Sequence, residues 1–308
     1  MRFALDALID PRLHLLTAES SVFYAGRTPG RGPGTPDELR AARAAAAPVP
    51  ADPPAVEETV TAGGRTVTLR ILLPVRRAVR GVFLQLHGGG FYLGSAATDD
   101  VANRRLADAL GLAVVSVDYR LAPEQPWPAA PDDCETAALW LAEHAERRFG
   151  TARLAIGGFS AGATLAMTTL LRLRDRSLPV FDCAVLQFGT YDLSARTPAG
   201  RLIADEYFLR AYCGAAADRT HPDISPIYAD LAGLPPALVV VGAADILLED
   251  NLAMAARLSA AGNEVDLRVY PGAPHGFTGH PTPMARAAHA DIDGWLESHL
   301  SAARFLGA

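Results

Sequence analysis

The chain has 308 residues, half of them hydrophobic, and a formal net charge of −6 at pH 7. This length allows one large α/β domain or two ordinary ones. The scattered basic residues and the negative net charge argue against a nucleic-acid partner. The chain contains no lysine, which excludes a Schiff-base lysine, a lysine general base and a P-loop.

The beginning of the chain does not resemble a signal peptide. Asp6 and Asp10 interrupt it, and it lacks a long apolar core. No apolar run reaches transmembrane length. We therefore expect a cytoplasmic protein without stable membrane insertion. The three cysteines have neither a disulfide pattern nor metal-ligand spacing, so they predict reduced, mostly buried thiols. They are Cys134, Cys183 and Cys213.

Residues 1–55 form a separate helical segment in this interpretation. Apolar residues at helical spacing predict a helix from Met1 to about Ala18. A Gly- and Pro-rich loop follows, and Thr35 then predicts the N-cap of a second helix with Pro36 at its first position. Two short helices and a Pro-rich link bury little by themselves, so this segment must pack on the remainder of the chain.

From Val56 onward, short apolar runs alternate with helical patterns. The predicted strands cover about 56–61, 65–73, 81–86, 113–117, 154–156, 183–188, 237–241 and 265–269, and the predicted helices 99–109, 132–149, 161–173, 249–261 and 282–300. This alternation predicts an α/β fold with a mostly parallel sheet and helices on both faces. The Gly63-Gly64 pair predicts an antiparallel hairpin at one edge. Residues 190–235 are Pro-punctuated and irregular.

The stretch around Ser160 carries the strongest chemical signal. It reads Gly158-x-Ser160-x-Gly162, between a short apolar run and a helical segment. In a sharp strand-to-helix turn the serine is pushed out of the sheet, and the flanking glycines avoid clashes. The pattern alone also fits an ordinary turn that contains a serine, so the rest of the chain must decide.

A serine nucleophile needs a base, and the base needs a carboxylate that holds its tautomer. His275 lies in a stiff loop after the last predicted strand, and Asp245 follows the strand before it. The chain order Ser, Asp, His suits an α/β-hydrolase sheet. The alternative acids, Glu249 and Asp250, are expected in the first turn of a helix, where acidic residues favour the helix dipole, so we favour Asp245.

The stretch His87-Gly-Gly-Gly90 follows a predicted strand. Consecutive glycines let the backbone come close to a ligand with its N–H groups exposed. The N–H groups of Gly88 and Gly89, together with that of Ala161 after the nucleophile, would form an oxyanion hole. We expect His87 to be structural rather than a base.

These motifs, together with Asp118-Tyr-Arg-Leu-Ala-Pro-Glu124 and Pro274-His275-Gly-Phe277, resemble the hormone-sensitive-lipase-like family of α/β-hydrolases. The resemblance runs from about Thr59 to the C-terminus. It implies carboxylester hydrolysis with Ser160, Asp245 and His275 as the triad, and this chemistry needs no metal or cofactor.

The family also places a small helical cap over the site. Its two parts correspond here to residues 1–50 and about 190–225. We therefore divide the chain into a cap segment, 1–55, and a catalytic domain, 56–308, that carries the cap insertion. Family members often dimerise through the sheet edge near the last strand, and Val265–Val269 is the candidate edge for a homodimer here.

Two residues depart from the family pattern. Phe159 precedes the nucleophile where members commonly have an acidic residue or Thr, and Ala163 stands where they commonly have Gly. Neither change touches a catalytic atom, but Phe159 is expected to reshape the acyl side of the pocket. Candidate pocket residues, each of which also fits a plain core position, are Phe91, Tyr92, Phe159, Tyr191 and Phe208.

The expected function is therefore that of a serine carboxylesterase for small to medium acyl esters, with a small-molecule ester as its partner. An amide or formamide hydrolase with the same triad is the first alternative. A non-catalytic ligand-binding receptor on the same scaffold is the second, and the presence of His275 and Asp245 speaks against it. A purely structural role would leave the glycine loops unexplained.

Overall fold

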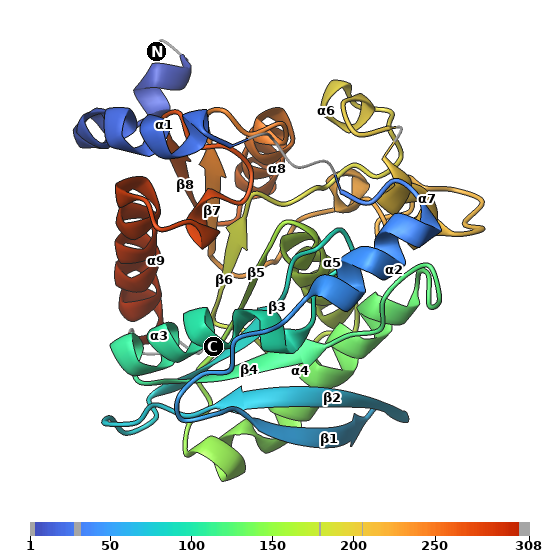
Figure 1. Ribbon diagram of the computed structural model, residues 1–308. Helices are drawn as coiled ribbons and strands as arrows, with labels where there is room; N and C mark the ends of the chain where they lie inside the picture. Colours follow the sequence, from blue (N-terminus) through green and yellow to red (C-terminus); the bar gives the residue numbers. More distant parts are fainter. Residues whose placement is uncertain (1–3, 28–31, 179, 205, 302–308) are drawn as a thin grey trace.

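The sheet of this protein runs through the whole molecule (Figure 1). The computed structural model describes residues 4–27, 32–178, 180–204 and 206–301. Within these residues the strands form one sheet in the order β1-β2-β4-β3-β5-β6-β7-β8. Their bounds are β1 Val56–Ala62, β2 Arg65–Leu72, β3 Gly81–Leu86, β4 Leu112–Asp118, β5 Leu154–Phe159, β6 Cys183–Gln187, β7 Ala237–Gly242 and β8 Val265–Tyr270.

The sheet is parallel except at one edge. β1 pairs antiparallel with β2, and β2 pairs antiparallel with β4. Gly63 and Gly64, both with positive φ, make the turn between β1 and β2, as the hairpin prediction required. β5 lies between β3 and β6, so the residue that follows it emerges near the middle of the sheet.

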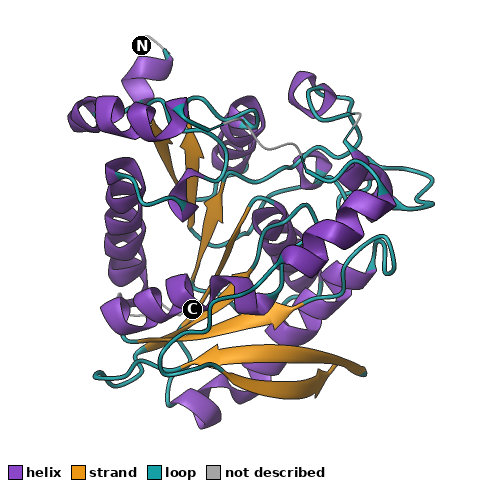
Figure 2. Ribbon diagram, viewed as in Figure 1, coloured by secondary structure: helices purple, strands orange, loops and turns teal. Residues whose placement is uncertain are grey.

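Helices cover both faces of the sheet (Figure 2). α4 (Ala129–Phe149), α5 (Ala161–Asp175) and α8 (Leu248–Ala260) pack on one face, and α3 (Asp100–Leu110) and α9 (Pro283–Ser301) pack on the other. β3 shows why two cores form: Leu84 faces the first and Phe83 the second, because alternate side chains point to opposite sides of a strand. The predicted fold class is confirmed.

The first helix differs from the prediction. In place of one helix to about Ala18, the chain forms two 3₁₀ turns, Leu5–Leu8 and Pro11–Leu16, followed by α1 (Thr17–Ala25). Pro11 lacks the N–H that a continuous helix needs, and Asp10 caps the new turn by accepting from the N–H of Arg12. The first three residues of that prediction lie outside the described residues.

The second predicted helix is confirmed as α2 (Pro36–Ala45). The side chain of Thr35 accepts from the N–H of Glu38 at 3.2 Å, and Pro36 occupies the first helical position. α1 packs against α9, whereas α2 lies apart from it, towards the other end of the molecule (Figure 1).

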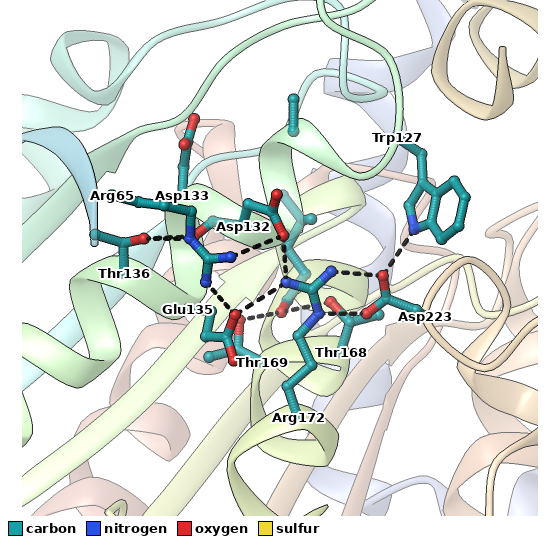
Figure 3. A network of polar contacts seen from close by, with 12 residues as sticks. Arg65, Trp127, Asp132, Asp133, Glu135, Thr136, Thr168, Thr169, Arg172 and Asp223 are labelled. Carbon is teal, nitrogen blue, oxygen red and sulfur yellow. Dashed lines mark hydrogen bonds and ion pairs between the residues drawn. The ribbon is translucent and has the colours of Figure 1, made fainter. Parts of the chain in front are cut away.

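The irregular stretch after β6 contains two short helices, α6 (Pro198–Arg201) and α7 (Tyr207–Cys213). A network of ion pairs fastens the end of this stretch to α4 and α5 (Figure 3). Arg172 of α5 donates to both carboxylate oxygens of Asp223, at 2.6 and 2.7 Å, and to Asp132 of α4 at 2.8 Å. The indole of Trp127 donates to the same Asp223 carboxylate.

The three cysteines are free and buried, as predicted. They come from α4, β6 and α7 and are therefore dispersed over the fold. Among the described helices, none combines the length and the apolarity needed to cross a membrane.

Candidate functional site

Ser160 occupies a strained turn between β5 and α5. Its φ of 53° and ψ of −123° are unfavourable for a residue with a side chain, and such strain is typical of functional sites. Its N–H donates to the carbonyl of Gln187 at the end of the neighbouring strand. Gly162 allows the turn, since a Cβ there would lie 2.0 Å from the carbonyl oxygen of Leu86.

Ser160, His275 and Asp245 form one hydrogen-bonded row. The Ser160 Oγ lies 3.0 Å from Nε2 of His275. The other ring nitrogen, Nδ1, lies 3.1 and 3.0 Å from the two carboxylate oxygens of Asp245. The Asp245 side chain is fully buried, whereas that of His275 is 36% exposed. A carboxylate that accepts from Nδ1–H leaves Nε2 free to take the proton of the serine hydroxyl.

The backbone brings the loops of Asp245 and His275 together. β7 and β8 are parallel neighbours, so their carboxyl ends lie at one edge of the sheet. Beyond the paired strands, the N–H of Ala244 donates to the carbonyl of Ala273 at 3.0 Å. The N–H of Leu247 donates to Oδ1 of Asp245 at 2.8 Å and fixes the carboxylate orientation.

The alternative acids lie where the sequence placed them, in the first turn of α8. Asp250 is buried and accepts hydrogen bonds from the backbone N–H groups of Tyr191 and Asp192. Among the described residues, only Asp245 offers a carboxylate within hydrogen-bond distance of the His275 ring.

The loop after β3 presents backbone to the same region. A Cβ on Gly88 would lie 2.5 Å from the ring of Phe159, the residue just before Ser160. Gly89 has a φ of 112°, a conformation that side chains disfavour. Within the described part of the chain, the N–H groups of Gly88 and Gly89 donate to no protein acceptor. Ala161 opens α5, so its N–H has no acceptor inside the helix.

The buried side chain of His87 supports this loop from the interior of the protein. Its buried ring stacks on Tyr119 with centroids 4.0 Å apart, and its Nδ1 lies 2.8 Å from the carbonyl oxygen of Gly88. Burial lowers the pKa of His87 to about 4, so its ring stays neutral near neutral pH. These contacts fit a structural residue.

The predicted aromatic residues divide into buried and partly exposed ones. Phe91 and Tyr191 are fully buried, and Tyr92 nearly so. Phe91 stacks on Tyr212 of α7 with ring centroids 3.8 Å apart, which joins the glycine loop to the irregular stretch after β6. Phe159 and Phe208 remain partly exposed.

Phe188 was missed by the sequence analysis. Its ring stands edge-on to His275, with centroids 5.1 Å apart, and its ring also lies 6.2 Å from that of Phe159. An aromatic residue at a strand end, just before Gly189, was the only sequence signal for it.

Arg43 ties α2 to the glycine loop and was also missed. It donates to the carbonyl of Tyr92 at 2.9 Å and to that of Ala122 at 2.6 Å, and it pairs with Glu124 at 2.8 Å. The hydroxyl of Tyr92 in turn donates to the carbonyl of Pro33. The N-terminal segment therefore contacts the backbone beside the predicted oxyanion hole.

The described residues offer a cavity away from this site and no metal-ligand cluster. A cavity of about 560 Å³ lies at the other end of the sheet, between the end of α5 and the start of β7, and is lined by residues such as Leu173, Phe181 and Leu234. No group of three or more His, Cys, Asp or Glu side chains in the described ranges is arranged to hold a metal ion.

Comparison with known proteins gives consistent matches. The model of the α/β hydrolase fold family matches residues 83–279. The ethyl acetate hydrolase of Pseudomonas putida is 34% identical over 232 residues, which cover 70% of this chain and 73% of that protein. The carboxylic ester hydrolase LipN of Mycobacterium tuberculosis is 36% identical over 208 residues, which cover 62% of this chain and 55% of LipN.

Solved structures are similar as well. The hyperthermophilic esterase of the archaeon Pyrobaculum calidifontis matches with a TM-score of 0.74 and 33% identity, over 80% of this chain and 86% of that chain. A mutant of the esterase rPPE, solved in complex with (S)-Ac-CPA, matches with a TM-score of 0.80 and 26% identity, over 98% and 100% of the two chains.

Proposed function

Since the chain belongs to the hormone-sensitive-lipase-like branch of the α/β-hydrolase fold family, we propose that it is a serine carboxylesterase for small to medium acyl esters. The observation that carries this proposal is the hydrogen-bonded row of Ser160, His275 and Asp245, in which each contact measures 3.0 to 3.1 Å. Relatives that are named as ester hydrolases support the choice of an ester as substrate.

The first half of the proposed reaction forms an acyl-enzyme. Oγ of Ser160 attacks the ester carbonyl carbon while Nε2 of His275 takes the hydroxyl proton. The carbonyl oxygen becomes negative and accepts from the N–H groups of Gly88, Gly89 and Ala161. When the tetrahedral intermediate collapses, the bond to the alcohol oxygen breaks and His275 gives its proton to that oxygen.

The second half repeats the sequence with water. Water gives a proton to His275 as its oxygen attacks the acyl carbon, and the bond to Ser160 breaks. His275 returns the proton to the serine, and the carboxylic acid leaves. Asp245 holds the ring in the required tautomer and stabilises its charged form.

The proposed pocket is narrow on the acyl side. The rings of Phe159 and Phe188 lie beside Gly88 and His275, and the segments 1–55 and about 190–225 act as a cap in this proposal. Aromatic rings this close to the reacting atoms leave limited room for an acyl chain.

A series of p-nitrophenyl esters of rising acyl length tests this function, with Ser160→Ala as the inactive control. We expect the highest kcat/KM between acetate and about hexanoate, because the aromatic rings exclude longer chains. A preference for long acyl chains would contradict the small-pocket proposal. A matched ester and anilide pair separates an esterase from an amide hydrolase, and faster anilide cleavage would favour the latter.

A further inference from the structure

Two neighbouring polar residues of α8, Asp250 and Asn251, are buried beside the candidate site. They are 2% and 0% exposed and follow the loop of Asp245. The proposed reaction uses neither of them. Polar side chains this deeply buried are costly unless they make hydrogen bonds that the fold needs.

Both side chains hold the backbone that follows β6. Oδ2 of Asp250 accepts from the N–H of Tyr191 at 2.5 Å and from that of Asp192 at 3.3 Å. Asn251 binds both sides of one residue, since its Oδ1 accepts from the N–H of Gly189 at 3.0 Å and its Nδ2 donates to the carbonyl of Gly189 at 2.9 Å. The same Nδ2 donates to the carbonyl of Leu247 at 2.8 Å.

Among the residues that the structure describes, Asp250 has no cationic partner for these bonds. None of the ion pairs found among the described residues includes Asp250. Burial raises the pKa of this carboxyl to about 7, although its two backbone hydrogen bonds act in the opposite direction. Burying a carboxyl group without a cation is costly. Its presence here therefore indicates that the fold needs the backbone of Tyr191 and Asp192 in a fixed position.

Phe188 directly precedes this backbone segment, residues 189–192, in the sequence. Its φ of 39° is unfavourable for a side chain, and strain of this kind persists only where the surroundings impose it. Three hydrogen bonds on Phe188 and the residue after it hold this conformation. The N–H of Phe188 donates to the carbonyl of Val240 at 2.7 Å. Asn251 makes two hydrogen bonds with the backbone of the next residue, Gly189. The ring of Phe188 thereby stands 5.1 Å from the His275 ring at an interplanar angle of 74°.

We infer that Asp250 and Asn251 are positioning residues, which hold Phe188 against the His275 ring and so fix the base in line with Ser160. α8 and the loop before it then control the base at two places. Asp245 binds its Nδ1, and the Asp250–Asn251 pair supports the side of its ring through Phe188. This inference rests on the proposed function, because it assigns His275 the role of the base.

Three variants test the inference in the full chain: Asn251→Leu, Asp250→Asn and Phe188→Ala. The readouts are kcat and KM for p-nitrophenyl acetate and the rate of labelling of Ser160 by a fluorophosphonate probe. We expect Asn251→Leu to lower kcat and the labelling rate together by about ten- to a hundredfold with little change in KM, because a misplaced base slows chemistry rather than binding. Asp250→Asn keeps one acceptor oxygen for Tyr191 and should lose less.

A double variant shows whether the effect passes through Phe188. If Asn251 acts by holding Phe188, then Asn251→Leu should cost little further activity once Phe188 is already Ala. If the activity losses of the two single variants multiply in the double variant, the proposed route through Phe188 is overturned. Asp250→Asn is nearly isosteric and provides the folded variant if Asn251→Leu does not fold.

Matched controls separate positioning from stability. Asn103 is also buried and donates to Ser116 of β4 at 2.8 Å, and the buried Asp100 pairs with Arg70. Asn103→Leu and Asp100→Asn should lower Tm but leave kcat unchanged. The inference fails if the folded α8 variants keep the parent kcat and labelling rate. Absence of labelling in the parent protein would instead overturn the proposed function itself.

Discussion

Phe159 directly precedes Ser160, the proposed nucleophile, and is expected to set this chain apart from the family pattern. Its ring occupies the space beside Gly88 that a side chain on that residue would need, and it lies near Phe188. It therefore adjoins the proposed oxyanion loop directly and the proposed base, His275, through Phe188. We expect the preference for the acyl group of the substrate to depend on Phe159.

Replacing Phe159 by the smaller Thr should widen the acyl side of the proposed pocket. We expect kcat/KM for p-nitrophenyl hexanoate to rise about tenfold relative to that for acetate, because each added methylene that fits an apolar pocket strengthens binding. The ratio of the two kcat/KM values measures this.

Phe181→Leu serves as the control. Phe181 lies just before β6, at the end of the parallel sheet opposite to Phe159, which ends β5. This variant should leave the ratio unchanged. An unchanged ratio in Phe159→Thr as well would show that Phe159 does not limit the acyl group.

At the scale of elements, α5 links the site to the rest of the molecule. Its first residues follow Ser160, and its other end carries Arg172, which binds α4 and the segment that contains Asp223 (Figure 3). The backbone N–H of Trp127, whose indole binds Asp223, donates to the carbonyl of Tyr212, which stacks on Phe91. The ion-pair network thus supports the irregular stretch after β6 where it contacts the glycine loop.

Arg172→Met should lower the free energy of unfolding by about 2–4 kcal/mol. The change leaves the partly or fully buried carboxylates of Asp132, Glu135 and Asp223 with fewer cations. Removing one partner of a buried ion pair is strongly destabilising. Because the Arg172 side chain is 19% exposed, solvent screens part of this cost. Urea unfolding of both proteins measures the difference.

Arg40→Met is the comparison, because Arg40 is 70% exposed and its ion pair with Asp37 is on the surface of α2. It should change stability very little. If the two variants unfolded at the same urea concentration, the network would not contribute to stability in the way proposed.

For the whole molecule, buried acids should make stability depend on pH. Burial raises the pKa of Asp99 to about 7, the neighbouring Asp100 adds to the shift, and a hydrogen bond with the Gln85 side chain opposes it. Between its ordinary value of 3.8 and about 7, the folded chain keeps a proton that the unfolded chain has lost, so this residue's stabilising contribution is lost as pH rises through that window.

Asp99→Asn should therefore stabilise the protein at pH 8 relative to pH 5. The amide carries no charge to bury, and the advantage should grow across the window and then level off above about pH 7. Tm measured for both proteins from pH 5 to 8 gives the difference. Asp37→Asn, on the exposed face of α2, is the control. A pH-independent difference in Tm would show that Asp99 is not protonated in the folded protein.

Much of the fold followed from local patterns. Gly63-Gly64 predicted the hairpin, Thr35 and Pro36 predicted the start of α2, and the apolar runs predicted the strands. The row of Ser160, Asp245 and His275 was predictable because each lies just after a parallel strand, and the carboxyl ends of such strands meet. The predicted first helix was wrong because the apolar spacing alone does not account for Pro11, which interrupts the helix.

The supporting contacts could not be predicted in the same way. The bonds from Asp250 and Asn251 to residues 189–192 and from Arg43 to Tyr92 join distant parts of the chain. No period or spacing in the sequence encodes such contacts, because they depend on how whole elements pack. The positive φ of Phe188 is likewise imposed by its surroundings and not by its residue type.

Labelling by a fluorophosphonate probe, followed by intact mass and peptide mapping, tests the central claim most directly. The probe reacts with a serine only when a nearby base activates it. We predict that the protein takes up one probe molecule at Ser160, that His275→Ala reacts far more slowly, and that Ser160→Ala takes up none. An unlabelled parent protein, or equal labelling of Ser160→Ala, would contradict the assignment of Ser160 as the nucleophile.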